Sequence, residues 1–129
     1  MQANNVDFTN SGCNPNHLKQ GATFSYEILW TKQNLITSTI YDPVDLTGFT
    51  AKMQLRFKEN DPLIFELSNA NGRIILGGIT GKINLLINAT DSSTIPKGKY
   101  KYDLKMTSPS GFVTYLIEGV FEVVEEITQ

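Results

Sequence analysis

The chain has very little of the chemistry that most catalytic and metal sites use. Its 129 residues include one cysteine and one histidine, Cys13 and His17. A single cysteine excludes an intrachain disulfide, so the hydrophobic core must stabilise the fold alone. Cys13 and His17 would supply two zinc ligands, but zinc takes about three or four from a protein and no other Cys or His is present. We therefore expect neither a metal site nor a Cys-His nucleophile.

The sequence also lacks a strong charge imbalance and a long apolar run. Eleven basic and thirteen acidic residues give a formal charge of −2, which offers no general attraction to nucleic-acid phosphates or anionic lipid. No apolar run approaches the roughly 20 residues that span a bilayer, and the N-terminus has no secretory signal pattern. We expect synthesis in a reducing cytosol, with no nucleic-acid, membrane or small-molecule partner and no cofactor.

The carboxylates and glycines form no recognisable catalytic pattern. Paired Asp and Glu side chains hydrolyse glycosides, but the glutamates of the predicted strands fall on outward faces, surrounded by solvent. Gly77, Gly78 and Gly81 precede a strand, so no helix N-terminus follows them to receive a phosphate. We predict no catalytic residues and interpret the chain as non-enzymatic.

What the sequence does have is a two-residue alternation of apolar and polar side chains, without a sustained helical period. The clearest run, 49–58, sets Ala51, Met53 and Leu55 against Lys52, Gln54 and Arg56. We predict an all-β chain, an immunoglobulin-like β-sandwich of about seven to nine antiparallel strands. The predicted strands are 24–31, 35–41, 49–58, 63–67, 73–76, 83–87, 99–107, 112–118 and 120–125, with a single helical turn or crossover in 89–95.

One short segment favours a sandwich over a barrel. In the run 96–100, Tyr100 stands two residues after Gly98, at the start of a predicted strand. Immunoglobulin-like folds place there a tyrosine whose hydroxyl bonds back to the backbone and closes a corner. The alternative is an ordinary core tyrosine at a strand end.

The N-terminal segment, residues 1–16, differs in composition from the predicted sandwich domain, residues 17–129. It is rich in Asn, Ser, Gly and Thr, and its sizeable apolar residues are Val6, Phe8 and Cys13. It is predicted to be an extended or flexible arm. One interpretation is a disordered terminus. The other is an arm whose Val6 and Phe8 dock onto a neighbouring subunit.

Charged side chains on the predicted outer strand faces provide further candidate docking residues. Lys52 and Arg56 lie on one strand, and Lys99 and Lys101 on another, while Glu122 gives the C-terminal strands the opposite sign. Such stripes commonly do no more than solvate a sheet and discourage edge pairing. The functional interpretation is a docking face, in which charge provides specificity more than affinity.

Several segments together resemble a family of small domains. They are Asp45–Ala51, Met53–Arg56, Gly81–Ile83, Ile95–Leu104 and Glu118–Val120, and the likeness covers residues 21 to 128. The sequence is similar to small immunoglobulin-like domain proteins of tailed bacteriophages, which are regarded as virion structural or accessory proteins. The resemblance implies the fold better than the task, because the shared residues are mostly turn and core positions.

We therefore expect a non-enzymatic virion protein, present in several copies, that docks on the capsid, neck or tail through other virion proteins. The alternative is a module that binds host-surface glycan. Glycan sites usually present exposed aromatic rings, whereas most aromatic residues here, Tyr115 included, are predicted to face inward. Only Tyr41 and Phe112 are predicted near loops.

Overall fold

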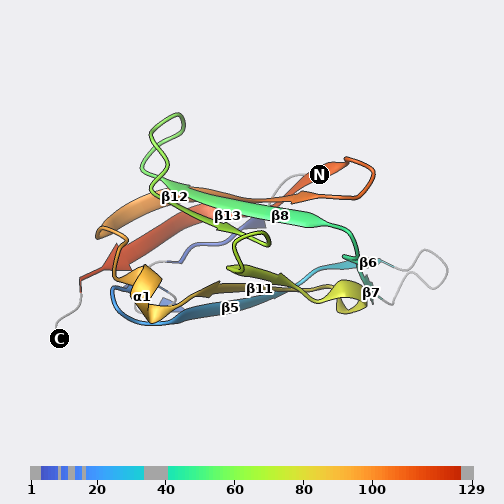
Figure 1. Cartoon of the computed structure of the whole chain (residues 1–129), viewed down its shortest axis with the longest axis horizontal. Helices are drawn as coiled ribbons and strands as arrows, with labels where there is room; N and C mark the ends of the chain where they lie inside the picture. The colour runs from blue at the N-terminus through green and yellow to red at the C-terminus, as the bar shows by residue number, and fades with distance from the viewer. Residues whose placement is uncertain (1–3, 9, 12–13, 16, 34–40, 126–129) are drawn as a thin grey trace.

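The computed structural model describes residues 4–8, 10–11, 14–15, 17–33 and 41–125 (Figure 1). The all-β class is confirmed, because most of the described residues lie in strands. The described residues contain one α-helix, the single turn α1 (Ala89–Ser92), and one 3-10 turn, η1 (Gly78–Thr80). Most of the predicted strand 35–41 lies outside the described residues, as does Cys13.

The strands form two larger sheets, which lie as two layers in Figure 1. The first has the order β1 (Asn4–Asn5), β13 (Val113–Val124), β12 (Gly98–Thr107), β8 (Thr50–Arg56) and β9 (Phe65–Ser68), and β4 (Leu18–Lys19) also pairs with β13. The second has the order β10 (Ile74–Leu76), β11 (Lys82–Ile87) and β5 (Phe24–Leu29). Two small pairs complete the set: β2 (Asn10–Ser11) with β3 (Asn14–Pro15), and β6 (Thr31–Gln33) with β7 (Tyr41–Pro43).

The core lies between the two larger sheets and follows the predicted alternation. Every second residue of β8, β11 and β12 is buried, as expected for strands with one face on a core. Aromatic rings join the layers, since Phe24 of β5 contacts Phe121 of β13 at a centroid distance of 5.2 Å. Phe57 and Leu63, which belong to the predicted strands 49–58 and 63–67, are exposed, because they lie beyond the ends of β8 and β9 in the connecting loop.

The predicted helical turn within 89–95 is confirmed as α1, which connects β11 of one sheet to β12 of the other. Its N-terminus is capped by Asn88, whose side chain accepts a hydrogen bond from the Asp91 backbone N–H at 2.8 Å. The predicted corner hydrogen bond is also observed, since the Tyr100 hydroxyl donates to the Pro96 carbonyl oxygen. Both features fix the path by which the chain enters β12.

The C-terminal third contains two strands, where the sequence predicted three. Residues 113–124 form one strand, β13, whose pairing with β12 shifts register between Leu104 and Lys105. Leu104 lies opposite Ile117 and Lys105 opposite Tyr115, so Leu116 is an extra residue, a β-bulge. The bulge allows the adjacent residues Leu116 and Ile117 both to be buried. It also turns Tyr115 to the outer face, which corrects its predicted inward orientation.

The N-terminal segment corrects a second prediction, because its described residues 4–8 belong to the sandwich. The Val6 N–H donates to Glu118 O at 2.8 Å and the Phe8 N–H to Val120 O at 2.7 Å. Phe8 is 0% exposed and packs against Phe24, Tyr26, Tyr102 and Phe121. The boundary predicted at residue 16 therefore does not separate Val6 and Phe8 from the domain.

Candidate functional site

The outer face of the larger sheet is the side of β8, β9, β12 and β13 that points away from the core. Charged side chains cross this outer face in three rows, which the strand register fixes. Arg56 lies opposite Lys101 in the first row, and Lys52 lies opposite Lys105 in the third. The second row crosses four strands with Glu66, Gln54, Asp103 and Glu118. Two cationic rows thus flank a row that is mainly acidic.

Side chains of like charge face one another within these rows. Directly opposite residues of an antiparallel pair have Cβ atoms about 4.5–5.5 Å apart, and like charges placed so are destabilising. Asp103 lies opposite Glu118. Partial burial raises the pKa of Asp103, an effect that Lys105 on the same strand opposes. Among the described residues, Lys52, Lys101 and Lys105 form no ion pair. The three lysines are therefore not held in ion pairs by the described part of the chain.

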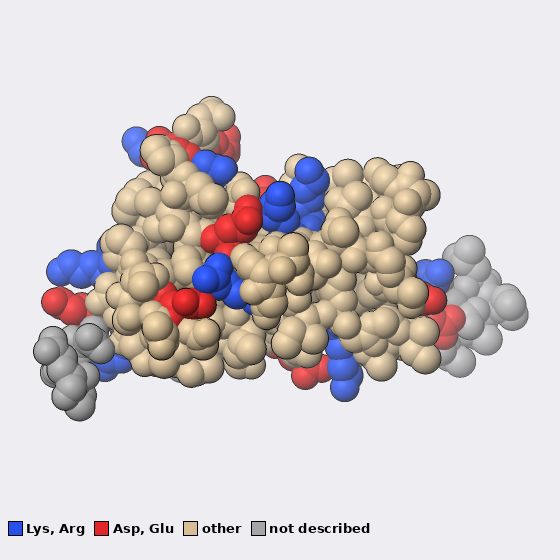
Figure 2. Space-filling model, in the orientation of Figure 1, with Lys and Arg blue, Asp and Glu red and all other residues tan. Residues whose placement is uncertain are grey.

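The first row forms part of a cavity of about 480 Å³, which we name the docking cavity. Its wall is the loop between β8 and β9. The charged residues of its lining are the cations Arg56, Lys58 and Lys101 and the carboxylates Glu59, Asp103 and Glu118. Figure 2 shows this loop projecting from the body of the molecule with charged side chains of both signs. The volume lies within the range of about 300–1,000 Å³ that is usual for ligand pockets.

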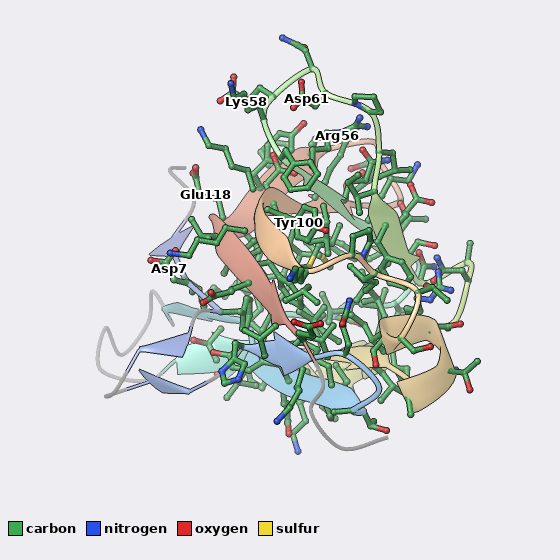
Figure 3. The ribbon with its side chains drawn as sticks, turned by 90° about the vertical axis from the view of Figure 1, so that its left-hand side faces the viewer. Asp7, Arg56, Lys58, Asp61, Tyr100 and Glu118 are labelled. Carbon is green, nitrogen blue, oxygen red and sulfur yellow. The ribbon has the colours of Figure 1, made fainter. Side chains whose placement is uncertain are left out.

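Arg56 fastens the loop of the docking cavity to the sheet. Its Nη1 donates to the Asp61 carbonyl oxygen at 2.6 Å, and its Nη2 donates to Gln54 Oε1 at 2.7 Å. Figure 3 shows Arg56 beneath the loop that carries Lys58 and Asp61. Because both hydrogen bonds restrain the guanidinium, they also restrain the cavity wall. Lys58 and Lys101 are exposed.

A second cavity, of about 360 Å³, lies on the same face at the third row. Its lining contains both cations of that row, together with hydroxyl, amide and carboxylate groups. The cavity is lined by Thr50, Ala51, Lys52, Glu66, Ser68, Asn69, Ala70, Lys105 and Thr107. Asn69 Oδ1 accepts the Ala51 N–H at 3.0 Å, so its amide Nδ2 is the group left to donate.

The predicted docking residues divide into two sets. Lys52, Lys99 and Lys101 are exposed on the outer face, and Arg56 is half-buried beneath the loop. Glu122 is half-buried on β13 opposite Lys99. These five residues lie on strands of one sheet, and their docking role remains a prediction.

The other set, Val6 and Phe8, does not join this face. Phe8 is buried in the core, and the backbone of Val6 pairs with β13. The prediction that Phe8 docks on a neighbour is therefore corrected. Its ring packs among Phe24, Tyr26 and Phe121, because burial removes the whole apolar side chain from water.

Sequence reasoning missed two features of the outer face. Lys58 and Glu118 were not assigned to a common site, because a loop and a strand distant in sequence meet only through the fold. Tyr115 was assigned to the core. The signal that identifies its true orientation is the run Tyr115-Leu116-Ile117, because three adjacent apolar residues break the two-residue period and indicate a bulge.

The described residues contain no group of three potential metal ligands, and Cys13 lies outside them. His17 is partly buried, and its Nδ1 has no hydrogen-bond partner among the residues that the structure describes. The described residues contain no helix long and apolar enough to cross a membrane.

A scan of protein-family models finds no match to the chain, and a search of curated proteins finds none.

Proposed function

We propose that this chain is a non-catalytic structural or accessory protein of a tailed-bacteriophage particle, located in the virion and bound to other virion proteins. Its outer face, centred on the docking cavity, is the surface that contacts an acidic region of a neighbouring protein. The resemblance of its turn and core segments to phage immunoglobulin-like domains supports the virion assignment. The docking surface is argued separately, from the charged residues of the site.

The strand order supports an immunoglobulin-like sandwich as the scaffold. In such sandwiches the third, sixth and seventh strands share one sheet, with an added strand beside the third in variable-type domains. Here β8, β12 and β13 are adjacent in one sheet, with β9 beside β8, while β5, β11 and β10 form the other. The hydrogen bond from Tyr100 to Pro96 lies at the start of β12. This strand corresponds to the sixth strand of such sandwiches, where the corner tyrosine is found.

The observation that carries the proposal is the opposed pair Arg56 and Lys101, with Lys58 on the wall above it. Opposed like charges destabilise the isolated sheet, whereas acidic side chains of a partner inserted between them form charge-assisted hydrogen bonds. Several such contacts made together provide more specificity than a single exposed ion pair. The loop held by Arg56 keeps the cations in place for that contact.

Charge reversal tests the proposal. The double variant Lys58→Glu with Lys101→Glu changes two exposed side chains that form no ion pair among the described residues, so the fold should keep its melting temperature. We expect incorporation of this variant into phage particles to be lost. The control is Lys32→Glu, which reverses the charge of an exposed lysine on β6, outside the larger sheet, that forms no ion pair among the described residues. Equal incorporation of both variants would contradict the docking surface.

A further inference from the structure

Tyr115 and Phe112 give the outer face an exposed aromatic end. Phe112 is 73% exposed in the turn before β13, and Tyr115 is 45% exposed on the strand. Tyr115 has no ring contact and no hydrogen bond to its hydroxyl among the described residues. The bulge at Leu116 places its side chain there, because a regular register would bury it. A ring oriented to solvent without support from neighbours is available to a ligand.

Lys105 lies directly beside this ring, opposite Tyr115 on one side and opposite Lys52 on the other. The two lysines face each other across neighbouring strands and are both exposed. Two ammonium groups so placed attract one anionic group between them, since each gains a charge-assisted hydrogen bond and their mutual repulsion falls. The third row of the outer face is therefore suited to an acid group next to an aromatic surface.

The second cavity adds neutral polar groups at the same place. Thr50 and Thr107 lie opposite each other next to the lysine pair, and their hydroxyls both donate and accept. The free amide Nδ2 of Asn69 is a further donor in the lining. Glu66 accepts from Gln54 Nε2 at 2.7 Å and so lies fixed at the edge of the cavity. Such a mixture of hydroxyl, amide and carboxylate groups suits the hydroxyls of a sugar.

We infer that this end of the outer face binds an acidic saccharide. The acid group lies between the ammonium groups of Lys52 and Lys105, and the apolar C–H face of a sugar ring stacks on Tyr115. Hydroxyls of the next sugar bond to Thr50, Thr107 and Asn69 in the second cavity. Recognition thus combines one charged contact, one aromatic contact and several neutral hydrogen bonds, the usual composition of a small-ligand site.

The acidic second row favours a saccharide over a polyanion with more closely spaced charges. Asp103 is two residues from Lys105 on the same strand, and Glu66 lines the second cavity. A nucleic acid carries a phosphate at every nucleotide, so it would bring phosphates against these carboxylates. A sugar with an isolated acid group avoids them. The inference is independent of the docking cavity, because it rests on other residues and requires no virion partner.

Binding is tested by immobilising uronic-acid, sialic-acid and sulfated oligosaccharides beside their methyl-esterified or desulfated counterparts and adding the purified protein. We expect retention on at least one acidic member and about tenfold weaker binding to its neutral counterpart, the factor that about 1.4 kcal/mol represents. Tyr115→Ala should lose about tenfold of that affinity, whereas Tyr115→Phe should keep it. Lys52→Gln with Lys105→Gln should abolish the preference for the acidic member, and Lys82→Gln should leave it unchanged.

The outcomes separate this inference from the proposed function. Failure to retain any acidic saccharide above its neutral counterpart overturns it, as does unchanged affinity in Tyr115→Ala. Equal effects of Lys82→Gln and the double lysine variant overturn the assigned site. Because Lys58 and Lys101 take no part in this site, loss of particle incorporation in their double variant, with saccharide binding retained, supports both proposals separately. Binding by the second-row variant Asp103→Asn should remain at least as strong as that of the unmodified chain.

Discussion

Gly119 lies so close beneath Asp7 that a side chain at position 119 would collide with it. A Cβ placed on Gly119 would stand 2.6 Å from Asp7 Oδ1 and against the Val6 carbonyl oxygen. The same Asp7 Oδ1 accepts the Val120 N–H at 3.0 Å. The glycine therefore allows the N-terminal segment to lie along β13.

Gly119→Ala should displace the segment that contains Val6 and Asp7. Overpacking of a close contact costs about 1 to 3 kcal/mol, and the loss here should be local. Hydrogen exchange measured residue by residue should show faster exchange at the amides of Val6 and Phe8, with little change in β8. Unchanged protection of those two amides would show that the segment does not depend on the glycine.

Phe8→Ala should destabilise the protein by about 3 to 5 kcal/mol, the usual cost of truncating a buried phenylalanine. The matched control is Phe112→Ala, which removes the same side chain from a position that is 73% exposed and should change stability by about 0.5 kcal/mol or less. Urea unfolding of the two variants measures both values. Similar losses would mean that the N-terminal segment is not part of the core.

Tyr102 should make stability depend on pH in the alkaline range. Burial, and next the negative charges of Asp7 and other neighbours, raise the pKa of Tyr102 above its ordinary value of 10.0. A raised pKa means that the folded state retains the proton, so this stabilisation is complete below about pH 10 and is lost as pH rises further. The hydroxyl donates to the Val6 carbonyl oxygen, a bond that requires the proton.

Tyr102→Phe tests that dependence. At pH 8 the variant should be less stable by about 0.5 to 1.5 kcal/mol, the net value of one hydrogen bond. Between pH 9 and pH 11 its stability should decline less steeply than that of the unmodified chain. Tyr100, whose pKa burial also raises, should account for part of the decline that remains. Parallel curves for the two proteins would exclude Tyr102 as the titrating group.

The sequence predicted the central strands well because their two-residue period is complete. In β8 and β12 each apolar residue of the alternation is buried, and the Tyr100 corner hydrogen bond follows from a local motif. The sequence-based prediction of burial was wrong at Phe8 and Tyr115 for a different reason. Phe8 is buried by pairing with a strand more than a hundred residues away, and Tyr115 is exposed by an extra residue in a long strand. Neither relationship appears in local periodicity.

The candidate site was predictable only in part for the same physical reason. The outward orientation of Lys52 and Lys101 follows from the alternation within each of their strands. Their assignment to rows depends on the register between strands, which apolar pattern constrains only to within two residues. The cavities depend further on loops, since the wall of the docking cavity is placed by the hydrogen bond from Arg56 to Asp61.

Lysine acetylation of intact particles tests the central claim, docking through the outer face, most directly. Purified phage and the free protein would be treated with the same reagent, and modification at each lysine compared by mass spectrometry. The account predicts strong protection of Lys58 and Lys101 in particles, with Lys82 modified equally in both samples. Equal modification of all three lysines, or absence of the protein from purified particles, would contradict it.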